Sequence, residues 1–232
     1  MPIGTRAASG QGLDYNVDIV MCIDATGSMH AIIDEVKSNA LSFYQKFVDE
    51  MEAQDPPKSV QQLRIKVIAF RDYGVDSEPM VESKFFVLGD GGEDAQFHDF
   101  VNNIEASGGG DEPENSLEAL ALAMKSDWVT TGAVRRHVIM LYTDASALPL
   151  GERAGSAGYP ASMPANLAEL REWWEGQRME RRAKRMLIFA PDCEPWPDMV
   201  DWPNTFHTPS KAGAGCDDTD IQTCIHLLVK SI

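Results

Sequence analysis

Three oxygen-bearing side chains lie within five residues of one another near the start of the chain. Asp24 follows the apolar segment 17–23, and Thr26 and Ser28 come next at alternate positions, with Gly27 between them. The glycine relaxes the backbone, so that the carboxylate and the two hydroxyls can converge. Hard oxygen donors of mixed charge suit a hard divalent cation such as Mg²⁺ better than they suit Zn²⁺. Taken alone, the pattern also fits an ordinary strand-to-helix turn with an N-cap.

Two further aspartates occur where later segments end. Asp144 comes two residues after the apolar segment 137–142, and Asp111 lies in the stretch GGGDEPEN. Because ligands bind beyond the carboxyl ends of parallel strands, Asp24 and Asp144 are expected to face the same crevice. Asp111 is open to two interpretations, since Asp111 with Glu114 three residues later also fits a capping box for the helix that follows. A direct role for Glu114 in the site stays open as well.

The elements that position these residues alternate between strands and helices. Apolar runs predict strands at 17–23, 63–70, 81–88, 137–142, 186–190 and 205–208. Apolar side chains at helical spacing predict helices at 29–51, 97–104, 117–124, 167–174 and 221–232. This order predicts an α/β fold with a doubly wound, mostly parallel central sheet, one antiparallel edge strand at 81–88, and helices on both faces. We expect residues 1–13 to form a flexible tail and residues 14–232 to form a single domain.

The composition limits the classes of partner. The 232 residues carry a formal charge of −16, and the sequence pI is about 4.6. Phosphates are repelled by such a charge, which argues against nucleic acid and anionic membranes as partners. The first residues contain no apolar core like that of a secretory signal, and no segment reaches the length of a transmembrane helix.

The cysteines form no C-x-x-C pair. Free thiols in a reducing cytosol are the simplest interpretation of the four, Cys22, Cys193, Cys216 and Cys224. An alternative is a zinc site made by Cys193, His207, Cys216 and Cys224, although their spacing is not that of a tight zinc motif.

Three loop motifs together resemble the metal-ion-dependent adhesion site of von Willebrand factor A domains. They are D-x-T-G-S-M at 24–29, F-R-D-Y-G at 70–74 and G-G-G-D-x-P-E at 108–114, a combination like that of hemicentin-like and kinase-linked A domains and of bacterial relatives. The resemblance extends from Tyr15 to Ile232. It implies a bound Mg²⁺, or Mn²⁺ or Ca²⁺ in its place, and the ligands Asp24, Thr26, Ser28, Asp111 and Asp144.

Asp111 differs from the residue of the better-known members, and Asp72 is an additional candidate for the site. Asp111 occupies the place where those members have a threonine, which changes the charge of the expected ligand. Asp72 of the second motif is a weaker candidate, expected as a turn residue or as a support for the ligands.

The resemblance implies binding without chemistry. The ion would keep one coordination position open, and an Asp or Glu carboxylate of a partner protein would complete it. A stand-alone domain of this family is expected to work beside an ATPase, a kinase or a phosphatase, here in the cytoplasm of a bacterium. On this interpretation the chain is not an enzyme.

Two other functions compete with this interpretation. A Mg²⁺-dependent phosphohydrolase would use Asp24 as its nucleophile, but such enzymes place a second aspartate where this chain has Thr26. The P-loop and dinucleotide-binding glycine motifs are absent. A scaffold that binds through metal-independent surfaces would use the basic run 178–185, or Trp196 and Trp202 in a proline-rich loop. Both tryptophans could equally belong to the core.

Overall fold

The computed structural model describes residues 14–31, 33–89, 92–110, 112–177, 179–210, 225–226 and 228–230. The predicted flexible tail at 1–13 and most of the predicted helix at 221–232 lie outside these residues. Residues 225, 226 and 228–230 are helical, as predicted. Within the described part of the chain, no helix is both long and apolar enough to cross a membrane.

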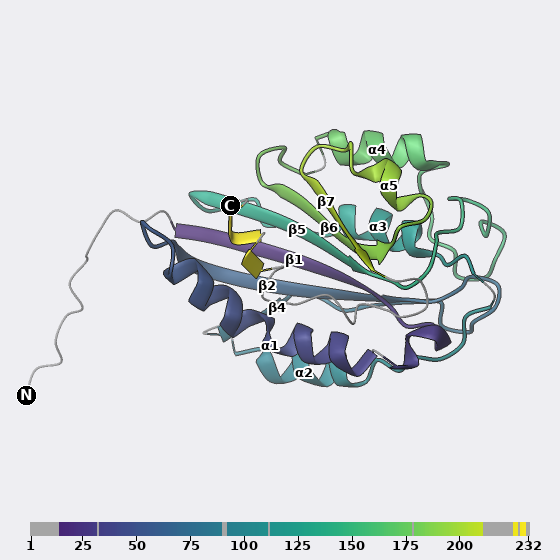
Figure 1. The fold of residues 1–232 in the computed structure, drawn as a ribbon, viewed down its shortest axis with the longest axis horizontal. Coiled ribbons are helices and arrows are strands. Elements are labelled where there is room, and N and C mark those ends of the chain that lie inside the picture. Colours follow the sequence, from purple (N-terminus) through teal and green to yellow (C-terminus); the bar gives the residue numbers. More distant parts are fainter. Residues whose placement is uncertain are drawn as a thin grey trace, which may run out of the picture.

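A seven-stranded, mostly parallel sheet forms the centre of the molecule (Figure 1), in the order β3-β2-β1-β5-β6-β7 with β4 also paired to β2. The strands are β1 Asp14–Asp24, β2 Ser59–Phe70, β3 Met80–Glu82, β4 Phe86–Val87, β5 Val134–Tyr142, β6 Lys184–Pro191 and β7 Thr205–Ser210. β1 is the central strand, and it is buried from its second residue to its last. This confirms the predicted doubly wound α/β fold.

Helices cover both faces of the sheet, as the apolar spacing predicts. They are α1 Ile33–Glu52, α2 Asp94–Asn102, α3 Ser116–Met124, α4 Leu167–Glu175 and the short α5 Trp196–Met199. Figure 1 shows α1 and α2 on one face and α3, α4 and α5 on the other. The side chains of β1 alternate between the two cores, with Ile19 and Met21 in the first and Val20 and Cys22 in the second.

Two local predictions need correction. The predicted edge strand at 81–88 is two short strands, β3 and β4, which both pair antiparallel with β2. The predicted helix start at Met29 is a 3-10 turn, Gly27–Ala31, and the α-helix begins at Ile33. This turn brings the hydroxyl of Ser28 toward the end of β5.

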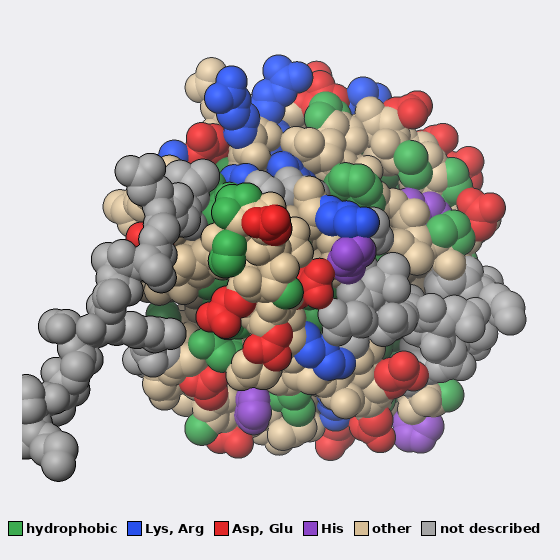
Figure 2. Space-filling view, turned by 60° about the vertical axis from the view of Figure 1, so that its left-hand side comes forward, with side chains coloured by type: hydrophobic (Ala, Val, Ile, Leu, Met, Phe, Trp, Pro, Cys, Tyr) green, Lys and Arg blue, Asp and Glu red, His purple; other side chains and the backbone are tan. Residues whose placement is uncertain are grey.

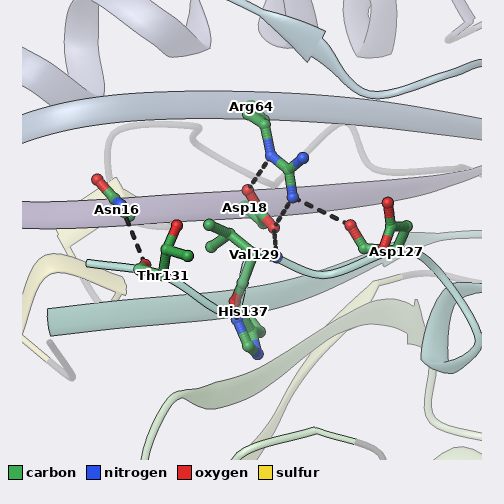
Figure 3. A network of polar contacts seen from close by, with 7 residues as sticks. All are labelled: Asn16, Asp18, Arg64, Asp127, Val129, Thr131 and His137. Carbon is green, nitrogen blue, oxygen red and sulfur yellow. Dashed lines mark hydrogen bonds and ion pairs between the residues drawn. The ribbon is translucent and has the colours of Figure 1, made fainter. Parts of the chain in front are cut away.

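A polar network joins the middle of β1 and β2 to the segment that precedes β5 (Figure 3). Arg64 of β2 donates to both carboxylate oxygens of Asp18 on β1, over 2.7 and 2.6 Å. The backbone N–H of Val129 donates to Asp18 as well, over 2.6 Å, and the carbonyl of Val129 lies 2.9 Å from His137 Nε2. The network ties the connection between α3 and β5 to the sheet.

Candidate functional site

The site begins at the carboxyl end of β1, where Asp24 is completely buried. One carboxylate oxygen of Asp24 accepts hydrogen bonds from the backbone N–H of Thr26 at 2.9 Å and from its hydroxyl at 2.6 Å. The other oxygen accepts from the hydroxyl of Thr143, at 2.6 Å. Burial and, to a smaller extent, the nearby charge of Asp144 outweigh the three hydrogen bonds, which lower the pKa, and the net result is a pKa of about 6 for Asp24.

Asp144 comes from the end of β5, the strand that pairs with β1. The hydroxyl of Ser28 donates to Asp144 Oδ1 over 2.9 Å. The strand order reverses between these two strands, which is where ligands bind in such sheets. The structure therefore brings Asp24, Thr26, Ser28 and Asp144 together in one hydrogen-bonded cluster at the carboxyl ends of β1 and β5.

The two hydroxyl oxygens stand where neighbouring ligands of one cation would stand. Thr26 Oγ1 and Ser28 Oγ are 3.1 Å apart. Because Thr26 donates its proton to Asp24 and Ser28 donates its proton to Asp144, both oxygens keep lone pairs for another partner. Adjacent ligands of an octahedral ion at about 2.1 Å are separated by about 3 Å. The separation of the two hydroxyls fits that geometry.

A glycine-rich loop forms another wall of the site. The backbone N–H of Gly27 donates to the carbonyl of Gly108 over 3.0 Å. Gly109 has φ +72, and a Cβ atom there would lie 2.9 Å from Thr26 Cβ. The carboxylate of Asp76 accepts from the N–H of Gly109, at 3.0 and 3.3 Å. A side chain at position 109 would therefore push the loop away from Thr26.

Two buried carboxyl groups lie behind this loop, Asp72 and Glu114. Asp72 accepts from the N–H of Gly110 over 3.2 Å. Burial, hydrogen bonding with Asp72 and the charges of Asp24, Asp72 and Asp144 together raise the pKa of Glu114 to about 9. Within the described residues the site contains these carboxyl groups and no Lys or Arg that hydrogen-bonds to them.

Several carboxylate oxygens lack a partner. Asp72 Oδ1, Glu114 Oε2 and Asp144 Oδ2 are all buried, and none has a hydrogen-bond partner among the described residues. Buried oxygens without a partner are costly, so three of them in one site indicate a missing polar or positively charged partner. A hard divalent cation is the group that carboxylates and hydroxyls of this kind hold best.

Side chains of Asp, Glu, His and Cys do not complete a metal site by themselves. No group of three or more of them is arranged to hold a metal ion in the part of the chain that the structure describes. A cation here would depend on the hydroxyls of Thr26 and Ser28 together with the carboxylates. Asp111, the fifth predicted ligand, lies outside the described residues, so its role as a ligand stays a prediction.

Some details of the site differ from the sequence interpretation. The predicted capping box requires Glu114 to lie in the first turn of the helix. This is wrong, because Glu114 precedes α3, which begins at Ser116 with Asn115 as its N-cap. Glu114 instead pairs with Ala147 in a parallel bridge. Asp72 is a turn residue, because its carbonyl accepts from the N–H groups of Val75 and Asp76, while its support for the ligands stays a prediction.

Sequence reasoning missed two residues of the site. Thr143 donates to Asp24, and Asp76 holds the loop through Gly109. A signal was present for Thr143, since a hydroxyl directly precedes Asp144 in the sequence.

The remaining candidates are the two tryptophans and the alternative zinc site. Trp196 and Trp202 are buried in the core, and Trp196 Nε1 donates to the carbonyl of Ala145 over 3.0 Å. They are therefore not available as partner anchors. The zinc alternative includes Cys216 and Cys224, which lie outside the described residues.

Comparison with known families agrees with this geometry. A family model described as von Willebrand factor A domain matches residues 18–149. No curated protein matches the sequence.

Solved structures with the same fold include a pilus adhesin and a matrix protein. The open conformation of the pilus adhesin SpaC from Lactobacillus rhamnosus GG has a TM-score of 0.54 and 12% identity, with 92% of this chain and 29% of that chain covered. Proximal thread matrix protein 1 from the mussel byssus, in a form with a zinc-occupied MIDAS motif, has a TM-score of 0.52 and 11% identity. There the match covers 92% of this chain and 46% of that chain. The chain thus spans less than half the length of these proteins.

Proposed function

This chain belongs to the von Willebrand factor A domain family, and from that premise we propose that it is a metal-dependent protein-interaction module. The proposed metal is Mg²⁺, with Mn²⁺ or Ca²⁺ able to replace it. The proposed ligands are Asp24, Thr26, Ser28, Asp111 and Asp144, held directly or through water. The motifs at 24–29, 70–74 and 108–114 supply one continuous site, as in the subgroup that they resemble.

The observation that carries the proposal is the pair of hydroxyls beside an unpartnered carboxylate oxygen. Thr26 Oγ1 and Ser28 Oγ are 3.1 Å apart, with their protons given to Asp24 and Asp144. Asp144 Oδ2 is buried and has no partner among the described residues. A divalent cation would satisfy all three oxygens at once and would relieve the repulsion among the buried carboxyl groups.

The partner would supply the last ligand from outside. Ser28 is exposed, so the site is open to solvent on the side of this hydroxyl. A hard divalent cation prefers an oxygen ligand, and a carboxylate is the strongest such ligand that a protein surface offers. We propose an Asp or Glu of a partner protein in this position, the partner being an ATPase, a kinase or a phosphatase.

The geometry gives little support to the phosphohydrolase. A carboxylate nucleophile has to reach the phosphorus atom with a free oxygen. Asp24 has no exposed surface, and both of its oxygens already accept hydrogen bonds from threonines. We therefore propose binding without catalysis.

A metal-independent scaffold that uses the basic run is also less well supported. Arg181 and Arg182 are exposed, but Lys184 is buried and donates to the carbonyl of Trp174. Arg178 lies outside the described residues. In the face drawn in Figure 2, most of the Lys and Arg side chains lie in the upper half of the view, with Asp and Glu side chains among them.

Calorimetric titration tests the proposal. Mg²⁺ and then Mn²⁺ are titrated into chelator-treated protein, wild type beside Asp24→Ala and Ser28→Ala. We expect saturable one-site binding in the wild type and a loss of at least about tenfold in affinity in both variants. Ser38→Ala, an exposed serine on α1, is the matched control and should bind like the wild type. Equal binding by Ser28→Ala and the wild type would contradict the proposed site.

A further inference from the structure

An apolar pocket lies at the same edge of the sheet as the proposed metal site. Its volume is about 340 Å³. Its walls come from the segments that follow β5 and β6 and from the first residues of α3 and α4, and they include Leu117, Ala147, Leu150, Ala165, Leu167 and Pro195. A space of this size can take one large aliphatic side chain with part of its backbone.

The pocket and the proposed metal site share a wall. Glu114, whose carboxyl group interacts with Asp24 and Asp144, is the bridge partner of Ala147 in the pocket wall. The backbone N–H of Leu148 donates to the carbonyl of Glu114 over 2.7 Å. Asp144 and Ala147 are three residues apart in one loop, a distance of at most about 10 Å along the chain.

The opposite wall is fixed to the same loop. Trp196 Nε1 donates to the carbonyl of Ala145, the residue after Asp144, so the segment with Pro195 is tied to the metal-site loop. Both walls of the pocket are therefore joined to the loop that carries Asp144.

The surroundings of the pocket are acidic. Glu194 lines it, and no Lys, Arg or His is among the described residues of its wall. Burial raises the pKa of the Cys193 thiol, and the negative charges of Glu112, Asp192 and Glu194 raise it further, which places three carboxylates around this cysteine. Glu112 precedes Glu114 by two residues, so one of these acids belongs to the segment that pairs with the pocket wall at Ala147.

We propose that this pocket is the second half of the partner-binding surface and takes an aliphatic side chain flanked by Lys or Arg. The partner segment carries its metal-binding Asp or Glu within about three residues of a Leu, Ile, Val or Met. The basic residue lies against the acids at the rim of the pocket. This inference rests on the proposed function, because the acidic residue of the partner is the one that completes the metal site.

Selection from a random peptide library tests the inference. Phage that display random 12-residue peptides are selected on the full chain in Mg²⁺, and the best peptide is synthesised with a fluorophore for anisotropy measurements. We expect peptides in which an acidic residue lies near an aliphatic residue and a basic residue. Replacing the aliphatic residue with Ala should weaken binding about tenfold or more, the effect of removing one buried side chain.

Variants of the pocket separate its contribution from that of the metal. Ala165→Trp fills the pocket from an exposed position and should weaken the same peptide about tenfold or more. Ala168→Trp, an exposed position on α4 that does not line the pocket, is the matched control and should bind within about twofold of the wild type. Leu167→Ala enlarges the pocket, and a selection on that variant should shift from aliphatic residues to Phe or Trp.

The outcomes that would overturn the inference differ from those that would overturn the proposed function. Peptides that need Mg²⁺ and an acidic residue, but that bind Ala165→Trp like the wild type, would overturn the pocket and leave the metal function in place. Peptides that need the pocket but bind equally in chelator would overturn the metal function and with it the combined surface. A selection that yields no peptide would overturn the combined surface too.

Discussion

Two aspartates of the buried strand β1, Asp18 near its middle and Asp24 at its carboxyl end, are in contrasting electrostatic environments. Asp18 receives two hydrogen bonds from the guanidinium of Arg64 and one from the backbone of Val129 (Figure 3). Asp24 receives hydrogen bonds from neutral groups and lies near further carboxyl groups, including Asp144 and Glu114. Both aspartates are buried, but only the first has a cation supplied by a described residue.

The contrast indicates which polar cluster is structural and which is a binding site. A buried carboxylate with its own guanidinium is satisfied within the fold and needs nothing from solution. Buried carboxyl groups without a cation raise the pKa values of one another, and such clusters are characteristic of functional sites. Substitutions in the two clusters should therefore differ in their effects on stability and on metal affinity.

We call Asp18, Arg64 and Val129 the structural cluster. Removing its cation should cause the largest loss of stability. Arg64→Met leaves Asp18 buried and uncompensated, so the free energy of unfolding should fall by about 3–5 kcal/mol in urea titrations. Arg171→Met removes a solvent-exposed pair with Glu175 and should cost less than about 1 kcal/mol. A cost for Arg64→Met similar to that of the control would remove the basis for calling this cluster structural.

We call Asp24, Asp144 and Glu114 the binding cluster. In the metal-free protein, this cluster should make the stability depend on pH in an unusual way. The pKa of Glu114 is raised from an ordinary 4.5 to about 9, so the folded chain binds this proton more tightly than the unfolded chain does. The contribution of Glu114 to the free energy of unfolding should therefore be largest below about pH 4.5 and should be lost as the pH rises toward 9.

Measurements with and without this group isolate its contribution. Thermal unfolding in chelator between pH 5 and 9 is compared for the wild type and Glu114→Gln, which keeps the shape of the side chain without its titration. The variant should have the flatter profile. Identical slopes would mean that Glu114 does not hold a proton in the folded state.

The close contact between the glycine-rich loop and Thr26 can be tested by comparing substitutions at two glycines. Gly109 and Gly92 have nearly equal positive φ values, +72 and +73, but only at Gly109 would a Cβ atom contact another residue, Thr26 at 2.9 Å. Gly109→Ala and Gly92→Ala should each lose about 1 kcal/mol of stability from backbone strain. Only Gly109→Ala should also lose Mg²⁺ affinity in calorimetry, and equal affinity in both variants would argue against a role for the loop.

Neutralising an acid of the binding cluster should have the smallest effect on stability. Asp144→Asn keeps the oxygen that accepts from Ser28 and removes a charge from a crowded site, so the metal-free protein should change by less than about 1 kcal/mol. Its Mg²⁺ affinity should fall by at least about tenfold. A loss of several kcal/mol in chelator would place Asp144 in the same structural class as Asp18.

Most strands of the sheet and the position of the candidate site could be predicted from the sequence. Buried strands reveal themselves as apolar runs, and the residues directly after such runs lie at the carboxyl edge, so Asp24 and Asp144 could be paired without coordinates. The spacing of Thr26 and Ser28 then indicated the chemistry. These are local patterns, and a single sequence contains them in full.

Features that depend on contacts between distant segments could not be predicted. Glu114 is turned toward the site because its backbone pairs with Ala147, and nothing near Glu114 in the sequence specifies that pairing. The ion pair of Asp18 and Arg64 depends on the register of β1 against β2. The apolar pocket likewise combines residues of four separate segments.

The most direct test of the central claim is to locate the ion. Crystals of the wild-type protein grown in Mn²⁺ would give an anomalous difference map in which the metal is identified by its own signal. We predict a peak about 2 Å from Ser28 Oγ and Thr26 Oγ1 and within reach of the carboxylates of Asp24 and Asp144, directly or through water. A well-diffracting crystal without a peak at this position would contradict the account, even if manganese were bound elsewhere on the acidic surface.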